Sequence, residues 1–179
     1  MNRKTLSGYC IVLALSSLLH ALSPAKTSIH LILPLFLLFY PTVTGYRVKI
    51  SLSPKDIMFG LAVSVLILAP YGIAFRAEPG DLTPYLIVFQ FLGVAFPEEF
   101  FFRGFLQDSL GRNYKAVVFA SLLFALAHLP QAIFSGGWIA LLSFFPSLIM
   151  GWLFLKTKNI LPGAIFHWVA NLIQQSIPG

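Results

Sequence analysis

The chain has 179 residues, of which 58% are apolar and 10% are charged. An ordinary soluble domain carries roughly 25% charged residues, and the mean hydropathy here is +0.83. These values exclude a soluble globular protein, a disordered tail and a nucleic-acid-binding module. The net charge of +6 fits a membrane protein whose basic loops fix its orientation. The single cysteine, Cys10, excludes an internal disulfide framework and a cysteine-rich metal site.

Seven apolar stretches approach the length of about 20 residues at which a helix spans the hydrocarbon core of a bilayer. In chain order they are Thr5–Leu22, Ile29–Tyr46, Ile57–Phe75, Pro84–Gln107, Lys115–Leu129, Trp138–Leu155 and Ile160–Ile177. The basic start at Met1–Lys4 is also typical of a signal peptide. Because no small-residue cleavage site is evident and the second stretch follows almost at once, the first stretch is predicted to remain as a membrane helix.

The links between these stretches are short and hold most of the charges, prolines and glycines that end helices. Pro130–Gly137 is one of these predicted links. None is long enough to separate domains. The sequence therefore predicts an all-α, polytopic membrane protein in which residues 1–179 form a single transmembrane domain, a bundle of about seven helices.

The basic residues predict the orientation of this bundle. With the N-terminus in the cytoplasm, nine lysines and arginines fall on the cytoplasmic side: Arg3, Lys4, Arg47, Lys49, Lys55, Arg112, Lys115, Lys156 and Lys158. Only Lys26 and Arg76 fall on the far side. Such a bias favours a cytoplasmic N-terminus and an external C-terminus.

One predicted span carries charges well away from its ends: Glu98, Glu99 and Arg103. Charged groups at this depth face the protein interior, pair with one another and usually mark a functional site. Glu99 and Arg103 are four residues apart, so they share a helix face and can pair. Glu98 is rotated by about 100° and lacks this partner. An unpaired carboxylate in an apolar wall is suited to the role of a general base.

Pro97 precedes the two glutamates and cannot donate a backbone hydrogen bond, which leaves the carbonyl of Gly93 free and predicts a kink. Irregular backbone at membrane depth is tolerated where it lines a polar cavity. The sequence thus predicts that Glu98 faces such a cavity.

Two further helices supply polar residues for the same cavity. One contains Phe124-Ala-Leu-Ala-His128, and the other contains His167-Trp-Val-Ala-Asn171, which places His167 and Asn171 one turn apart on one face. At about 1.5 Å per residue, these side chains and Glu98 lie about 10–20 Å from the cytoplasmic end. The sequence therefore predicts that the three helices bring them together near mid-membrane. His20 and His30 lie at a helix end and a helix start, so both are interpreted as interfacial residues.

The order Glu98-Glu99-Phe-Phe-Phe-Arg103, Phe124-x-x-x-His128 and His167-x-x-x-Asn171 resembles the signature of the CAAX-protease and bacteriocin-processing (CPBP) intramembrane endopeptidases, which include the type II CAAX prenyl proteases. The resemblance extends over residues 84–177, which would form the catalytic core. It implies that Glu98 activates a water and that His128 holds that water. It further implies that His167 and Asn171 stabilise the oxyanion, while Glu99 orients the site and pairs with Arg103.

Whether a metal takes part is open at this point. Glu98, His128 and His167 are the residue types of a zinc site with an open position. However, the chain has no His-Glu-x-x-His helix, and zinc on Glu98 would leave no obvious general base. Metal-free, glutamate-type catalysis without a cofactor is therefore the favoured hypothesis, with a zinc metalloprotease as the alternative.

The leading functional hypothesis is an intramembrane endopeptidase that cleaves a peptide or protein precursor near the bilayer. Its substrate would be a lipidated CAAX-like terminus, a leader peptide or a C-terminal sorting tail. The small size favours a multi-pass protein of a prokaryotic cell membrane. One alternative is a non-catalytic bacteriocin-immunity or scaffold protein. Another is a proton-coupled transporter, although the inverted repeats and paired broken helices typical of transporters are not found.

Overall fold

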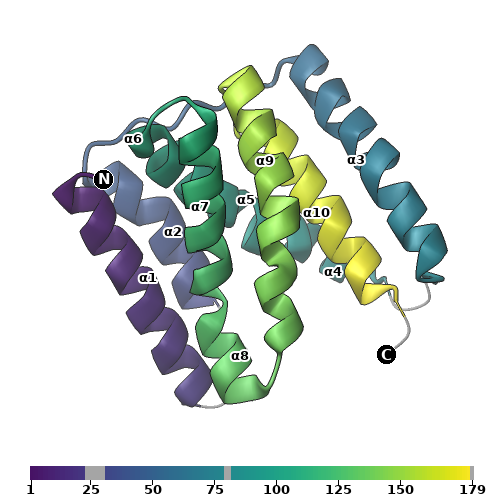
Figure 1. The fold of residues 1–179 in the computed structure, drawn as a ribbon, viewed down its shortest axis with the longest axis horizontal. Coiled ribbons are helices and arrows are strands. Elements are labelled where there is room, and N and C mark those ends of the chain that lie inside the picture. The colour runs from purple at the N-terminus through teal and green to yellow at the C-terminus, as the bar shows by residue number, and fades with distance from the viewer. Residues whose placement is uncertain (23–30, 79–81, 178–179) are drawn as a thin grey trace.

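The computed structural model describes residues 1–22, 31–78 and 82–177, and the described part of the chain contains helices and no strand. The longer helices are α1 (Arg3–Ala21), α2 (Ile32–Val43), α3 (Pro54–Ala74), α7 (Tyr114–Ala127), α9 (Phe144–Thr157) and α10 (Leu161–Gln175). Shorter segments complete the chain: α4 (Pro84–Phe89), η2 (Gln90–Ala95), α5 (Phe96–Glu99), η3 (Phe100–Gln107), α6 (Asp108–Leu110), α8 (Leu129–Ser135) and η4 (Trp138–Ser143). They form one helical bundle (Figure 1).

The helices run alternately up and down the bundle. The N-terminus, the start of α3, α6 and the turn between α9 and α10 lie at one end (Figure 1). The nine basic residues predicted to be cytoplasmic belong to segments at this end, whereas Arg76 follows α3 at the other. Lys26 lies outside the described residues. The nine basic residues therefore lie at one end of the bundle, and the orientation of that end toward the cytoplasm stays a prediction.

Five of the helical stretches are long and apolar enough to cross a membrane: Arg3–Ala21, Pro54–Ala74, Pro84–Leu110, Tyr114–Ser135 and Trp138–Thr157. The remaining two predicted spans are also helical but shorter, with 12 residues in α2 and 15 in α10. At about 1.5 Å per residue, these two rise only about 18 and 23 Å. The all-α membrane bundle is confirmed, while seven full crossings stay a prediction.

The predicted link at Pro130–Gly137 is wrong for most of its length. Residues Leu129–Ser135 form helix α8, which continues α7 after a break at His128. Pro130 lies in the first turn of α8, where its missing N–H removes no helical hydrogen bond. The helix ends at Gly136, whose φ of 71° is one that glycine adopts without steric cost. A proline marked the start of a helix here, not its end.

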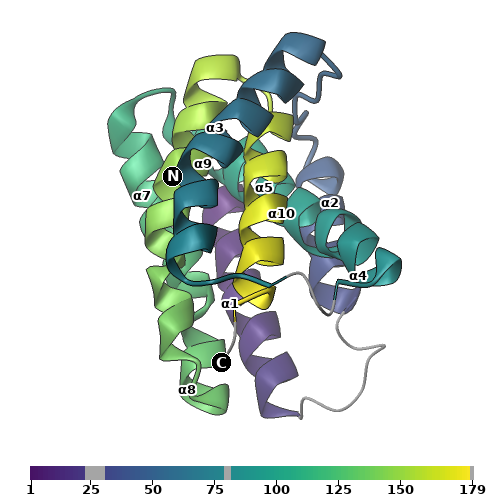
Figure 2. The same cartoon turned by 90° about the vertical axis from the view of Figure 1, so that its right-hand side faces the viewer.

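The long helix Pro84–Leu110 has an irregular backbone, as Pro97 predicted. Two π-helical segments, η2 and η3, flank the four α-helical residues Phe96–Glu99. A π-turn inserts extra backbone and is found most often at functional sites. Figure 2 shows α4 at the edge of the bundle and α5 in its middle, between α10 and α2. The irregular stretch therefore delivers both glutamates to the centre of the molecule.

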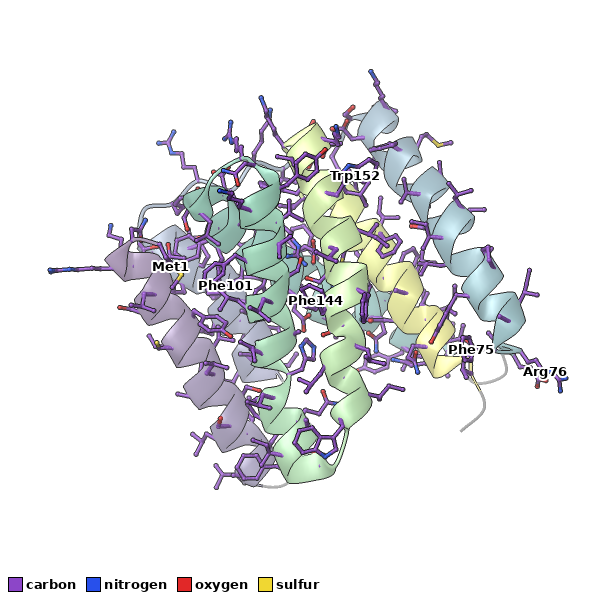
Figure 3. All side chains as sticks on the ribbon, in the orientation of Figure 1. Met1, Phe75, Arg76, Phe101, Phe144 and Trp152 are labelled. Atoms are coloured by element: carbon purple, nitrogen blue, oxygen red, sulfur yellow. The ribbon has the colours of Figure 1, made fainter. Side chains whose placement is uncertain are left out.

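Aromatic side chains fill this centre, and apolar side chains also cover the outside. Phe101, Phe102, Phe105 and Phe124 belong to the buried hydrophobic core. Many leucines, valines and isoleucines are exposed on the outer faces of α1, α3 and α7 (Figure 3). A soluble monomer rarely exposes so much contiguous apolar surface, whereas a bundle embedded in lipid does.

Candidate functional site

Glu99 and Arg103 form a fully buried ion pair, as their spacing predicts. The Nε of Arg103 donates to Oε2 of Glu99 at 3.2 Å, and both side chains are 0% exposed. The guanidinium also donates through Nη2 to Oγ of Ser147 at 2.7 Å. A buried charge must be paired and hydrogen-bonded to be tolerated. Ser147, on α9, is a partner that sequence reasoning missed.

Glu98, rotated by about 100° from Glu99 on the helix, forms no hydrogen bond with Arg103 or Ser147. Its side chain is 20% exposed, and Oε2 is buried without a hydrogen-bond partner among the described residues. Its Oε2 lies 3.7 Å from Nε2 of His167. This separation is too long for a direct hydrogen bond. Glu98 therefore keeps an acceptor oxygen available for a small molecule.

His167 on α10 lies between the two glutamates. Its Nε2 is 3.7 Å from Oε2 of Glu98, and its Nδ1 is 3.6 Å from Oε1 of Glu99. Gly163, one turn earlier on α10, makes room for this arrangement because a Cβ there would lie 2.7 Å from Oε2 of Glu99. A single imidazole from α10 thus lies between two adjacent glutamates of another helix, without a direct hydrogen bond to either among the described residues.

His128 lies at the break between α7 and α8. Its Nδ1–H donates to the carbonyl of Phe124 at 2.9 Å, because a carbonyl can only accept. In the neutral ring, Nε2 is then the acceptor nitrogen. The local geometry fixes the tautomer of His128.

Glu98 and His128 share one cavity of about 140 Å³, while His167 is not among the described residues that line it. The other lining residues come from α1, α2, η3, α7 and α8: Val12, Ser16, His20, Leu33, Leu37, Phe102, Ala127 and Gln131. His20, interpreted from the sequence as an interfacial residue, does lie in the last turn of α1, but it also lines this cavity, where α1 packs against α8. The sequence does contain a signal for this placement of His20, because Ser16 and His20 are two polar residues one turn apart in an otherwise apolar helix. His30 lies outside the described residues.

Asn171 is on the same face of α10 as His167 but is already hydrogen-bonded. Its Nδ2 donates to Oε1 of Gln90 at 3.2 Å. One turn further toward the start of α10, the indole N–H of Trp168 donates to the carbonyl of Ile87 at 2.9 Å. These bonds fasten α10 to the first part of the Pro84–Leu110 helix. Gln90 is a second partner that sequence reasoning missed.

Phe124 connects the separate parts of the site. Its ring lies 4.9 Å from that of His128 and 5.7 Å from that of His167, measured between ring centroids. The guanidinium carbon of Arg103 lies 5.3 Å from the centroid of the same ring, which is a cation–π distance. Phe124 therefore orients both histidines against the buried ion pair.

A zinc site would need Glu98, His128 and His167 as ligands arranged around one point. No group of three or more His, Cys, Asp or Glu side chains in the described ranges is arranged to hold a metal ion. His167 packs between the two glutamates, whereas His128 faces the cavity. This arrangement does not fit the tetrahedral set that zinc requires.

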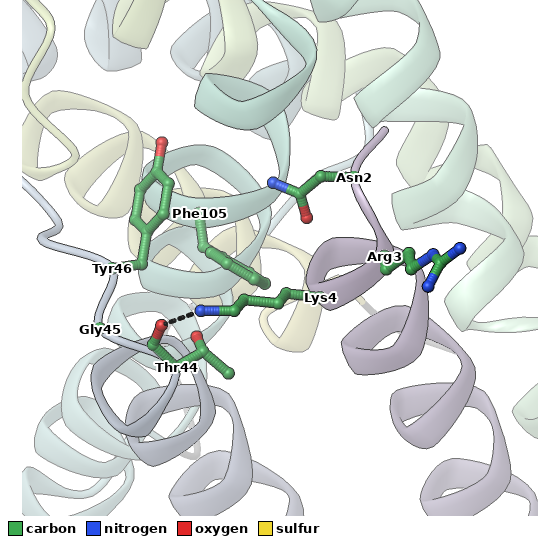
Figure 4. Close-up of a pocket in the computed structure, with 7 residues that line it drawn as sticks. All are labelled: Asn2, Arg3, Lys4, Thr44, Gly45, Tyr46 and Phe105. Carbon is green, nitrogen blue, oxygen red and sulfur yellow. Dashed lines mark hydrogen bonds between the residues drawn. The ribbon is translucent and has the colours of Figure 1, made fainter.

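A second, larger cavity of about 430 Å³ lies at the basic end of the bundle (Figure 4). It is lined by Asn2, Arg3, Lys4, Thr44, Gly45, Tyr46 and Phe105. Lys4 donates to the carbonyl of Thr44 at 2.9 Å, and Arg3 points away from the other labelled side chains (Figure 4). None of the predicted site residues lines this cavity.

The fold and the site together define a polytopic helical membrane protein with a buried, charged centre. A family model described as "Type II CAAX prenyl endopeptidase Rce1-like" matches residues 80–173, which is more than half of the chain. The chain therefore belongs to the Rce1-like family of CAAX-type intramembrane proteases. No curated protein and no solved structure gives a significant match.

Proposed function

We propose that the protein is an intramembrane endopeptidase in which Glu98 activates a water molecule. The observation that supports this best is the buried, unpartnered Oε2 of Glu98 in the cavity that it shares with His128. An acceptor oxygen left without a partner in an apolar interior is costly. A water bound there would offset that cost and would be the nucleophile.

Glu98 and His128 each offer an acceptor to such a water. A water that donates one hydrogen to the carboxylate of Glu98 and the other to Nε2 of His128 keeps a lone pair for a substrate carbonyl. Glu98 accepts a proton as the water oxygen bonds to the carbonyl carbon. The same proton is then transferred to the leaving nitrogen as the C–N bond breaks. General-base catalysis of this kind contributes about 10²–10⁴-fold to the rate.

His167 and Asn171 are proposed to stabilise the oxyanion of the tetrahedral intermediate. An asparagine amide has two N–H donors, so the bond to Gln90 leaves one for the substrate. Glu99 and Arg103 are proposed to hold the helix in place without touching the reacting atoms. Each donor that faces a developing oxyanion in a dry site contributes about 2.7–4 kcal/mol.

The substrate is proposed to be a membrane-associated peptide or protein precursor. The family description names a CAAX prenyl endopeptidase, which favours a lipidated C-terminus over a leader peptide or a sorting tail. A prenyl chain would partition into the bilayer that surrounds the bundle and raise the local concentration of the peptide. We further propose that the protein lies in a prokaryotic cell membrane. Its catalytic core is proposed to be residues 84–177, acting without a metal or another cofactor.

The test is cleavage by the purified protein in detergent or liposomes. A farnesylated CAAX peptide, the same peptide without the lipid and a peptide with a hydrophobic sorting tail would be compared by mass spectrometry. We expect cleavage of the farnesylated peptide and none by Glu98→Gln. Binding of a peptide by the wild type without any cleavage would favour a scaffold or immunity protein instead.

A further inference from the structure

The cavity that holds Glu98 continues toward the end of α1 and into α8. Beyond Glu98 and His128, its polar lining consists of Ser16, His20 and Gln131. The proposed chemistry uses none of these three. His20 is the penultimate residue of α1, which ends at Ala21, so this part of the cavity lies toward the end of the bundle away from the nine basic residues (Figure 1).

His20 is held in the same way as His128. Its Nδ1–H donates to the carbonyl of Ser16, four residues earlier, at 2.8 Å. The neutral ring therefore turns an acceptor nitrogen, Nε2, to other partners. A carbonyl on the same helix fixes the tautomer in both cases. Since Glu98, His128 and His20 are all acceptors, this region favours a ligand that brings N–H or O–H donors.

Gln131 supplies the complementary group. Its side-chain amide offers both a carbonyl acceptor and N–H donors. A peptide main chain presents N–H and C=O groups in alternation, so an imidazole acceptor and an amide that line the same cavity match the groups of one stretch of it. The volume of about 140 Å³ corresponds to about four or five waters at about 30 Å³ each. This is room for a short segment of peptide, against the apolar wall of Val12, Leu33 and Leu37.

We infer that His20 and Gln131 form a subsite that binds the substrate main chain next to the scissile bond. This inference rests on the proposed endopeptidase function. His20 accepts a hydrogen bond from a substrate N–H through Nε2, and Gln131 pairs with an adjacent peptide group. Both are positioning residues: they hold the peptide while Glu98 and His128 act on the bond.

The experiment compares three substitutions of His20, with the farnesylated CAAX peptide as the probe. His20→Gln places an amide oxygen near the position of Nε2, whereas His20→Asn places one near Nδ1. We expect His20→Ala and His20→Asn to raise KM about tenfold, with kcat changed by less than about twofold, because uniform binding is lost. His20→Gln should recover most of the wild-type KM. Leu18→Ala, an exposed neighbour on α1, should match the wild type.

A second measurement does not depend on the variants of His20. Cys10→Ser removes the native thiol, and Glu98→Gln prevents cleavage of the peptide. In this background, the rate at which a small maleimide alkylates Gln131→Cys is measured with and without the farnesylated peptide. We expect the peptide to slow alkylation at least fivefold there and to leave Leu18→Cys unaffected. Suppose that the wild type cleaves the peptide. An unchanged KM in His20→Ala, or an alkylation rate of Gln131→Cys that the peptide does not slow, would then overturn the subsite but not the proposed function. A wild-type protein that cleaves none of the peptides would overturn the proposed function and the subsite with it.

Discussion

Arg103 donates to the carboxylate of Glu99 at 3.2 Å across one helical turn, and both side chains are completely buried. Glu98, the residue next to Glu99, lies on another side of the same helix and keeps an unpartnered oxygen in a cavity. A rotation of about 100° per residue thus gives two neighbouring glutamates different surroundings. Glu99 forms a structural ion pair, whereas Glu98 keeps a carboxylate oxygen that can accept a hydrogen bond or a proton.

Replacing Arg103 by alanine should impair folding as well as activity. Glu99 would be left buried with its main partner removed, at a cost on the order of 3–5 kcal/mol for a broken buried pair. We expect a lower yield of folded protein and a lower melting temperature in detergent, followed by thermal unfolding of purified samples.

Arg112→Ala is the matched control for this substitution. Arg112 pairs with Asp108 at the same four-residue spacing, but its side chain is 58% exposed. Exposed ion pairs contribute little to stability, so Arg112→Ala should behave like the wild type. An Arg103→Ala protein that is as stable as Arg112→Ala, yet fails in the chemical step, would show that Arg103 takes part in catalysis.

Gly60 should be essential for the contact between α3 and α10. A Cβ at Gly60 would lie 2.8 Å from Cα of Pro162, a backbone atom that cannot turn aside. Gly60→Ala should therefore push the two helices apart, destabilise the fold by about 1–3 kcal/mol and shift His167. Gly72→Ala on the same helix is the control, because its Cβ would meet Ile173 at an ordinary 3.5 Å. Equal melting temperatures for the two variants would contradict this account of the helix contact.

The topology can be tested with fused reporters. A reporter after Gly179 should be active only on the non-cytoplasmic side, and one inserted at Arg112 should be active only in the cytoplasm. The expectation follows from the nine-to-two distribution of basic residues. A cytoplasmic signal from the Gly179 fusion would mean that the predicted seven crossings include one too many or one too few.

The parts of the site that follow from local helix geometry were predictable from the sequence. The spacing of Glu99 and Arg103 predicted their ion pair, which the structure contains. The same geometry predicted that Glu98 lacks this partner. The loop charges alone oriented three helices so that Glu98, His128 and His167 were expected about 10–20 Å from the cytoplasmic end. In the structure, the ring of Phe124 and the 3.7 Å approach of His167 to Glu98 connect these residues in space.

The parts that depend on how helices pack were not predictable. His20 joins the cavity because α1 lies against α8, and α8 itself was mistaken for a link because of Pro130 and Gly136. The π-helical turns around Glu98 have no local sequence signal beyond Pro97. The bond from Asn171 to Gln90 joins positions 81 residues apart, which no periodic pattern reveals.

Glu98→Gln should nearly abolish cleavage while the fold and peptide binding persist. Glutamine keeps the shape and a hydrogen-bonding oxygen but cannot take up the proton, so we expect a loss of about 10²–10⁴-fold in kcat. Glu78→Gln, an exposed carboxylate outside the helices, is the control and should retain full activity. Near-normal turnover in Glu98→Gln would remove Glu98 from the role of general base.

Activity should not depend on a bound metal. If Glu98 acts on water directly and His128 only orients that water, no metal ligand can be stripped from the site. We therefore expect an unchanged initial rate of peptide cleavage across a titration with a strong chelator, and substoichiometric metal in the same active preparation by elemental analysis. His128→Ala should still lose activity about as severely as Glu98→Gln, because the water would be held by one acceptor instead of two. Zinc at one ion per chain, with activity lost on chelation and restored by added zinc, would instead make Glu98, His128 and His167 ligands, brought together by a rearrangement of the site.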